Sequence, residues 1–132
     1  MRKGALASVA LALVLLGTGP SGAADSGQVY RMQRNAGRCS GGNSTSVLAV
    51  SRYDRNTLRV RFSIAHSRPG QTWQVFGSND RVRIFAVTKV TRSDGTVRVR
   101  RRTKDRRGPD HVKVAASNTD SGEACSAAVK GF

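Results

Sequence analysis

Two histidines, His66 and His111, are the side chains of this chain best suited to hold a metal or transfer a proton. Metal sites in proteins usually combine three or four His, Cys or carboxylate ligands. The two cysteines are expected to pair with each other, and each histidine falls at the end of a predicted strand. The sequence therefore predicts no metal site and no cofactor.

Catalytic patterns are also missing. No Gly-x-Ser-x-Gly nucleophile turn occurs, and a hydrolase with two carboxylates needs an acid and a base on either side of the scissile bond. The carboxylates nearly all fall in predicted turns, where Asp serves hydrogen-bonded turn geometry. These residues are Asp54, Asp80, Asp94, Asp105, Asp110, Asp120 and Glu123. We expect a protein that is not an enzyme.

Arginine is the remaining chemical signal. The 132 residues contain 23 Lys plus Arg against 8 Asp plus Glu, a formal charge of +15. Such a charge attracts polyanions over a long range, including nucleic acid, anionic cell-wall polymers and acidic polysaccharides. The alternative explanation of the charge is compositional. Of the 23 basic residues, 18 are Arg, as is typical of proteins from GC-rich genomes, where Arg is abundant on any solvent-exposed surface.

The first 24 residues have the layout of a secretory signal peptide. Arg2 and Lys3 precede an uncharged run of 12 residues over 5–16, and small residues lead to Ala24. A membrane-spanning helix needs about 20 apolar residues, so no membrane span is expected. The sequence predicts cleavage after Ala24 and a secreted protein, extracellular or in the cell envelope.

Two cysteines remain in the mature chain, Cys39 and Cys125. In an exported protein an even pair is expected to form a disulfide. This bridge would span 86 residues, for which the chain-entropy model gives a stabilisation of about 4.5 kcal/mol.

Residues 25–44 are rich in Gly, Ser, Asn and Arg and lack periodicity, which predicts a flexible arm that becomes ordered at Cys39. From residue 45 the chain alternates apolar and polar residues in short runs separated by turns. Seven strands are predicted, over 45–52, 57–66, 71–77, 81–90, 96–103, 111–117 and 123–132. Ser93-Asp94-Gly95 predicts a hairpin.

This spacing without helical periodicity indicates one all-β domain over 45–132, an antiparallel two-sheet sandwich, with a small β-barrel as the alternative. Strict alternation gives each sheet one buried face. The predicted core is Leu58, Val60, Phe62, Ile64, Trp73, Val75, Val82, Ile84, Val97, Val99, Val112, Val114 and Val129.

The run RGPDHVKVAA over 107–116 resembles the late part of bacterial immunoglobulin-like domains, as do Trp73 on the third predicted strand and the strand count. The chain is also similar in its order of features to small exported actinobacterial proteins of unknown function. These features are a signal peptide, a Cys after a short arm, a strand with Trp and a final strand with Gly-Glu-x-Cys. The cysteines do not occupy the antibody-type positions. The resemblance implies a seven-stranded immunoglobulin-like sandwich and no particular activity.

In an immunoglobulin-like order the second and fifth strands are neighbours. The resemblance therefore implies that Arg59 and Arg61 lie beside Arg98, Arg100 and Arg102, all facing water. Like charges opposite one another in a sheet cost about 0.2–1 kcal/mol per pair, a cost that folding alone does not require. These five arginines are the predicted binding residues. Arg31, Arg34 and Arg38 in the arm offer a comparison of similar charge.

We therefore expect a secreted, non-enzymatic binding or structural module at the cell envelope. A first alternative is a polyanion-binding protein that uses the Arg-rich sheet face. A second is a secreted enzyme, or an inhibitor of secreted enzymes, that acts through the loops over 67–70 or 104–109. The expected partners are an anionic envelope polymer or an acidic protein.

Overall fold

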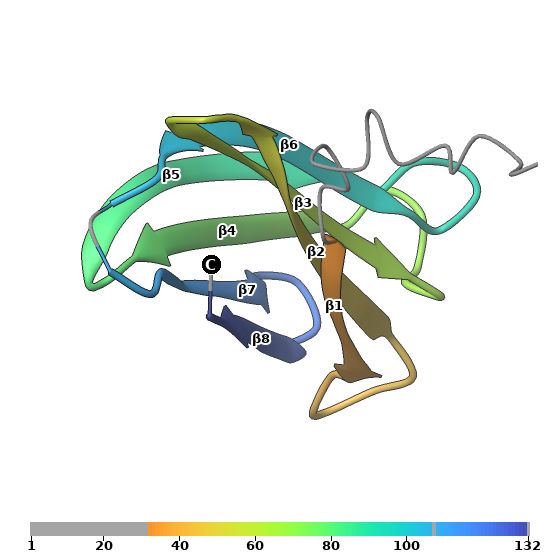
Figure 1. Ribbon diagram of the computed structural model, residues 1–132. Helices are drawn as coiled ribbons and strands as arrows, with labels where there is room; N and C mark the ends of the chain where they lie inside the picture. The colour runs from red at the N-terminus through yellow and green to blue at the C-terminus, as the bar shows by residue number, and fades with distance from the viewer. Residues whose placement is uncertain (1–31, 107, 132) are drawn as a thin grey trace, which may run out of the picture.

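The computed structural model describes residues 32–106 and 108–131, and this part of the chain is all-β (Figure 1). The predicted signal peptide and residues 25–31 lie outside the described residues. The strands, in chain order, are β1 (Met32–Arg38), β2 (Thr45–Asp54), β3 (Thr57–Ala65), β4 (Thr72–Asn79), β5 (Val82–Val90), β6 (Val97–Lys104), β7 (His111–Asn118) and β8 (Ala124–Lys130).

The strands form two antiparallel four-stranded sheets. The first sheet has the order β1-β2-β3-β6, and the second has the order β5-β4-β7-β8. The two sheets lie over one another and do not close into a barrel (Figure 1). The expected sandwich is confirmed, and the small-barrel alternative is not what the chain forms.

The described chain has eight strands where the sequence predicts seven. The additional strand is β1, which lies inside the segment predicted to be a flexible arm and pairs along its whole length with β2. The side-chain amide of Asn35 also donates to the carbonyl of Ala128 on β8, at 2.9 Å. Nearly all of β1 is exposed on both faces, so it carries none of the apolar alternation that reveals a strand.

The core lies between the two sheets. Except in β1, alternation places one face of the strand inward, so the apolar side chains of β3, β4, β6 and β7 meet at the centre. Eleven of the thirteen predicted core residues are buried, with Trp73 fully inaccessible. The other buried apolar residues of the core are Leu48, Val50, Phe85, Ala116 and the two cysteines.

Val82 and Ile84 were expected in the core; this expectation is wrong for Val82, whereas Ile84 packs against the margin of the core. Val82 is 44% exposed at the start of β5, and Ile84 is only partly buried. Gly77 pairs with Phe85 and Ser78 with Arg83, so Ile84 is an extra residue that shifts the alternation of β5. Phe85 therefore points inward and is buried, although the predicted core does not include it.

Ser93-Asp94-Gly95 does not make a hairpin. It turns the chain from β5 in the second sheet to β6 in the first sheet. Gly95 has a φ of +79°, and a Cβ there would lie 2.6 Å from the carbonyl oxygen of Ser67. The glycine is needed because the two loops touch, with the amide of Ser67 donating to the carbonyl of Gly95 at 3.1 Å.

Cys39 and Cys125 form the expected disulfide. Cys39 follows β1 in the first sheet and Cys125 lies in β8 of the second, so the bridge joins the sheets along one side of the sandwich. Beside it, Ser40 pairs with Ala124. The disulfide thus anchors β1, which has few apolar contacts of its own.

Candidate functional site

The pairing of β3 with β6 brings the five predicted binding arginines together. Arg59 lies opposite Arg102 and Arg61 opposite Arg100, while Arg98 lies opposite Ser63. Their neighbours in sequence, such as Val60 and Val99, are buried, so alternation turns all five arginines to the outer face of the first sheet. We call this surface the Arg face.

Tyr53, at the end of β2, orients two of these arginines. The Arg59 guanidinium lies 4.9 Å from the centre of the Tyr53 ring, and the Arg102 guanidinium lies 3.8 Å from it. A cation over an aromatic face is favourable by about 0.5–1 kcal/mol at exposed sites. This stacking holds two like charges on one ring.

The Arg face lacks neutralising carboxylates among the described residues. The ion pair found in this part of the chain joins Arg52 to Asp105 and includes none of the five arginines. Two carboxylates lie at the margins of the face, Asp54 and Asp94. The backbone N–H of Asn56 chiefly lowers the pKa of Asp54, with Arg102 as a minor cause. The Thr96 hydroxyl chiefly lowers the pKa of Asp94.

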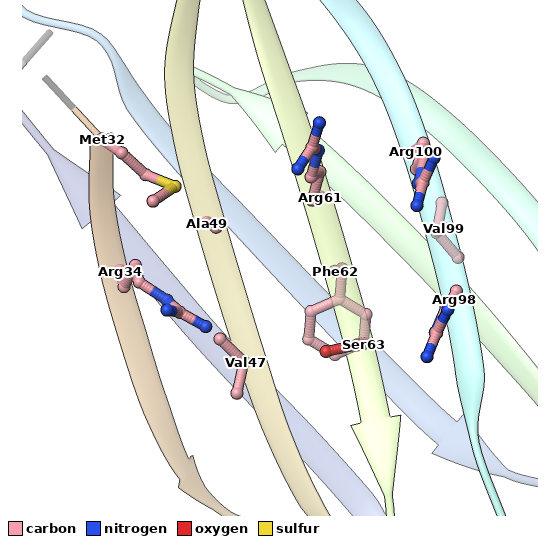
Figure 2. Close-up of a pocket in the computed structure, with 10 residues that line it drawn as sticks. All are labelled: Met32, Arg34, Val47, Ala49, Arg61, Phe62, Ser63, Arg98, Val99 and Arg100. Carbon is pink, nitrogen blue, oxygen red and sulfur yellow. The ribbon is translucent and has the colours of Figure 1, made fainter. Parts of the chain in front are cut away.

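A shallow groove of about 250 Å³ crosses the outer face of the first sheet (Figure 2). Its floor is formed by small β2 side chains, Val47 and Ala49, which lie between β1 and β3. Met32 and Arg34 line the groove on the β1 side, and Arg61 and Ser63 line it on β3 (Figure 2). The lining continues to Arg98 and Arg100 of β6. The groove therefore combines an aliphatic floor with cationic walls.

A second hollow, of about 460 Å³, is lined only by arginines: Arg59, Arg61, Arg100, Arg101 and Arg102. Alternation along β6 assigns Arg101 to a position that faces inward, and Arg101 lies opposite Val60 of β3. Because β6 is an edge strand, the side chain emerges at the sheet edge, where its guanidinium donates to the carbonyl of Arg100 at 2.9 Å.

Sequence reasoning missed Arg34, Met32 and Arg101 as members of this surface. Alternation assigns Arg101 to the inward side of β6, and its position on an edge strand exposes it. Arg34 and Met32 belong to the segment interpreted as an arm. The arm arginines proposed as a separate comparison set are consequently unsuitable, because Arg34 lines the groove and Arg31 lies outside the described residues.

The other candidate residues are dispersed. His66 follows β3 near the start of β4, whereas His111 bonds through its backbone to Asp80 just after the end of β4. The histidines are thus at opposite ends of the sandwich. Residues 32–106 and 108–131 contain no group of three or more His, Cys, Asp or Glu arranged to hold a metal ion.

Three carboxylates outside the Arg face accept hydrogen bonds from distant backbone amides. Asp80 accepts from the amide of His111 at 3.0 Å, and Asp120 accepts from the amide of Thr72 at 2.7 Å. Glu123, buried beside the disulfide, accepts from the amide of Ser44 at 3.1 Å. These bonds join segments that are 31, 48 and 79 residues apart in sequence, so these carboxylates hold distant segments together, which the interpretation as local turn residues did not include.

Asp110 is the most enclosed of the carboxylates. It accepts from the Asn79 side-chain amide at 2.9 Å and from the amide of Arg106 at 3.1 Å. Burial raises the pKa of Asp110, and contact with Asp105 raises it further. The cluster joins β4 to the loop before β7.

The loops considered for an inhibitor or enzyme are not exposed along their whole length. Ser67 is buried and its hydroxyl accepts from the indole N–H of Trp73 at 3.1 Å. In the other loop, Asp105 is engaged with Arg52, and residue 107 lies outside the described residues.

No family model, no curated protein and no solved structure matches this chain. In the part of the chain that the structure describes, no helix is long and apolar enough to cross a membrane.

Proposed function

We propose that this protein is an exported, non-enzymatic binding module of immunoglobulin-like type that binds an anionic polymer through its Arg face. The N-terminal pattern supports export, and the disulfide is compatible with an oxidising compartment. Two strand pairings support the immunoglobulin-like type. The β3–β6 pair corresponds to strands B and E of that fold and the β4–β7 pair to strands C and F.

One observation carries the binding proposal: like charges lie directly opposite one another with no carboxylate between them. Arg59–Arg102 and Arg61–Arg100 are cross-strand pairs, and neither pair takes part in an ion pair within the described chain. Such an arrangement costs stability. A polyanion would relieve this repulsion, and guanidinium groups bind phosphate, sulfate or carboxylate through two parallel hydrogen bonds.

The aromatic side chain beside the Arg face bears on the ligand. Tyr53 is 38% exposed, and two guanidinium groups already stack on its ring. Stacking of nucleic-acid bases needs exposed aromatic platforms, so recognition of a charged polymer backbone fits this surface better than recognition of bases.

The test is binding to heparin and to inorganic polyphosphate over a range of salt concentrations. Replacing Arg98, Arg100 and Arg102 by Ser should weaken binding strongly and reduce the salt dependence, because fewer counterions are released. The matched control replaces Arg83, Lys113 and Lys130 by Ser. These three basic residues are exposed on the second sheet, and their loss removes the same net charge.

A located site predicts a much larger loss of affinity for the first triple variant than for the second. Equal losses would mean that net charge alone drives binding, and the compositional explanation of the arginines would then hold. Absence of salt-dependent binding by the unmodified protein would refute the proposal.

A further inference from the structure

The hollow at the β3–β6 edge of the first sheet differs from the rest of the Arg face, because every residue that lines it is an arginine. We call it the Arg hollow, and its members are Arg59, Arg61, Arg100, Arg101 and Arg102. The groove beside it has a mixed lining of apolar, polar and basic residues. The lining of the Arg hollow narrows the class of anion that this sheet can bind, and the inference rests on the proposed function.

Four of the five arginines stand at the corners of a small rectangle. Arg59 lies opposite Arg102. Two residues farther along β3, Arg61 lies opposite Arg100 of β6 (Figure 2). The Cβ atoms of a cross-strand pair are about 5 Å apart, and two residues of strand span about 6.8 Å. Both lengths are below the Debye length of about 8 Å at physiological salt, so the four charges act on one another and on a shared ligand.

Arg101 adds a fifth guanidinium from a different direction. Along β6 it lies between the two cross-strand pairs, opposite Val60. It is exposed because β6 is an edge strand, and its guanidinium donates to the carbonyl of Arg100 at 2.9 Å. The Arg hollow is therefore lined from the sheet face and from the sheet edge, and five positive charges border one volume of about 460 Å³.

Tyr53 restrains one end of the rectangle before any ligand binds. Its ring centre lies 4.9 Å from the Arg59 guanidinium and 3.8 Å from that of Arg102. No member of the Arg hollow takes part in the ion pair found within residues 32–106 and 108–131. Ordering of side chains before binding lowers the entropy cost of association, so this cluster is better prepared for an anion than five independent surface arginines.

A ligand that neutralises the Arg hollow must place several anions within the length of two strand residues. Acidic polysaccharides carry sulfates and carboxylates at separate positions of their sugar rings, and carbon units separate the phosphates of polyol and nucleic-acid chains. In a phosphoanhydride chain, neighbouring phosphates share one oxygen and follow each other more closely than successive strand residues, which are about 3.4 Å apart. Three adjacent phosphates therefore match the length of the rectangle.

We infer that the Arg hollow binds a run of three or more adjacent phosphates, as in inorganic polyphosphate, through the phosphates alone. One cross-strand pair of arginines faces each outer phosphate of the run, and Arg101 is level with the middle one. Each guanidinium offers two parallel N–H groups to phosphate oxygens.

The first experiment compares inorganic polyphosphate with poly(glycerol phosphate) of equal phosphate number. Both polymers carry one negative charge for each internal phosphate, so the total charge is matched while the spacing of the phosphates differs. Each is titrated into the protein without its predicted signal peptide at about 0.1 M salt. Polyphosphate should bind at least about tenfold more tightly, a ratio equivalent to about one additional hydrogen bond between charged groups.

The second experiment uses tripolyphosphate, which is short enough to occupy the Arg hollow alone. Arg101→Ser and Arg98→Ser remove the same charge from the same strand, but Arg98 does not line the Arg hollow. Arg101→Ser should weaken binding about tenfold. Arg98→Ser should weaken it about twofold or less, because Arg98 lies beyond the rectangle and salt screens its charge. Thermal unfolding of each variant checks that it is folded.

Competition against bound polyphosphate distinguishes the sources of a phosphate run. Tripolyphosphate should compete better than diphosphate, because two phosphates leave part of the rectangle unfilled. ATP should compete no better than tripolyphosphate. Tighter competition by ATP would assign the Arg hollow to a nucleotide, and equal competition by diphosphate would assign it to a single diphosphate group. Either result would overturn the inference.

The remaining outcomes separate this inference from the proposed function. Equal affinity for the two polymers, or equal losses from Arg101→Ser and Arg98→Ser, would refute a site for adjacent phosphates. The proposed function would still stand if polymer binding remained sensitive to the triple replacement of Arg98, Arg100 and Arg102. If neither polymer binds, both proposals fail.

Discussion

Arg61 of β3 lies directly opposite Arg100 of β6, and both side chains point to the outer face of the first sheet. No carboxylate of the described chain forms an ion pair with either residue. The folded state therefore holds a like-charge pair that the unfolded chain separates. The pair gives the Arg face an effect on stability as well as on binding.

We predict that Arg61→Thr stabilises the unliganded protein by about 0.2–1 kcal/mol at low salt while it weakens polyanion binding. Urea unfolding near 0.01 M and near 1 M salt checks the cause, because the Debye length falls from about 30 Å to about 3 Å and the gain should shrink. Lys113→Thr is the control, since Lys113 is exposed on β7 and lies opposite Ser78 and Ala128, which carry no charge. A loss of stability at both salt concentrations would contradict the repulsion argument.

Gly77 and Phe85 are a packing pair on β4 and β5. A Cβ on Gly77 would lie 2.2 Å from a ring carbon of Phe85, so Gly77→Ala should destabilise the fold by about 1–3 kcal/mol. The double variant Gly77→Ala, Phe85→Leu should lose less than the sum of the single variants, because the smaller side chain makes room. Strictly additive losses, measured by denaturant unfolding, would show that the two residues do not compete for space.

Trp73 is fully buried and its indole N–H donates to the hydroxyl of Ser67 at 3.1 Å. Trp73→Ala should cost about 3–5 kcal/mol because it empties the centre of the core. Ser67→Ala leaves a buried donor without its partner and should cost about 1–3 kcal/mol. Calorimetry measures both, and a loss below about 1 kcal/mol for Trp73→Ala would contradict a central role.

The Cys39–Cys125 bridge joins the residue that follows β1 to β8. The exported protein should have a mass two hydrogens below that of the reduced chain and no alkylatable thiol. Replacing both cysteines by Ser should lower stability by up to about 4.5 kcal/mol. It should also expose the amides of β1 to hydrogen exchange before those of β3, because β1 has little buried apolar surface. Two reactive thiols in the native protein would disprove the bridge.

Asp110 predicts a pH dependence of stability. Its pKa is raised above the ordinary value of 3.8 by burial and by Asp105, so the folded state binds this proton more tightly than the unfolded state. The resulting stability is present below pH 3.8 and is lost as pH rises through the raised pKa. Asp110→Asn keeps an acceptor for Asn79 and adds a donor toward Asp105.

The Asp110→Asn variant should therefore melt at a higher temperature than the unmodified protein at neutral pH, and the difference should vanish in acid. Melting temperatures across this range provide the measurement, with Asp120→Asn as an exposed control. A variant that is less stable than the unmodified protein at every pH would refute this linkage.

Strands with one solvent-exposed face and one buried face could be predicted from the sequence. In β3, Leu58 and Phe62 alternate with arginines, and a two-residue period of this kind has only one arrangement that buries the apolar set. Placing Arg61 next to Arg100 needed an assumption about strand order as well, because β3 and β6 are not consecutive. The structure supports that assumption.

Two strands could not be predicted correctly, for different physical reasons. β1 is exposed to solvent on both faces, and its position depends on pairing with β2 and on the nearby disulfide. β5 is shifted by the extra residue Ile84, and Phe85 turns inward because Gly77 leaves room for its ring. Local periodicity reveals neither that β1 has a partner strand nor that a glycine on the opposite strand leaves space for Phe85.

The sequence by itself determined the all-β class, the pairing of the two cysteines and the outward direction of the five arginines, because composition and alternation are local properties of the chain. Only the tertiary structure decided that the groove has two walls. Arg34 lies in one row with Ala49 and Arg61 because β1 adds to the sheet beyond β2. That arrangement depends on contacts between distant segments, which no single stretch of sequence specifies.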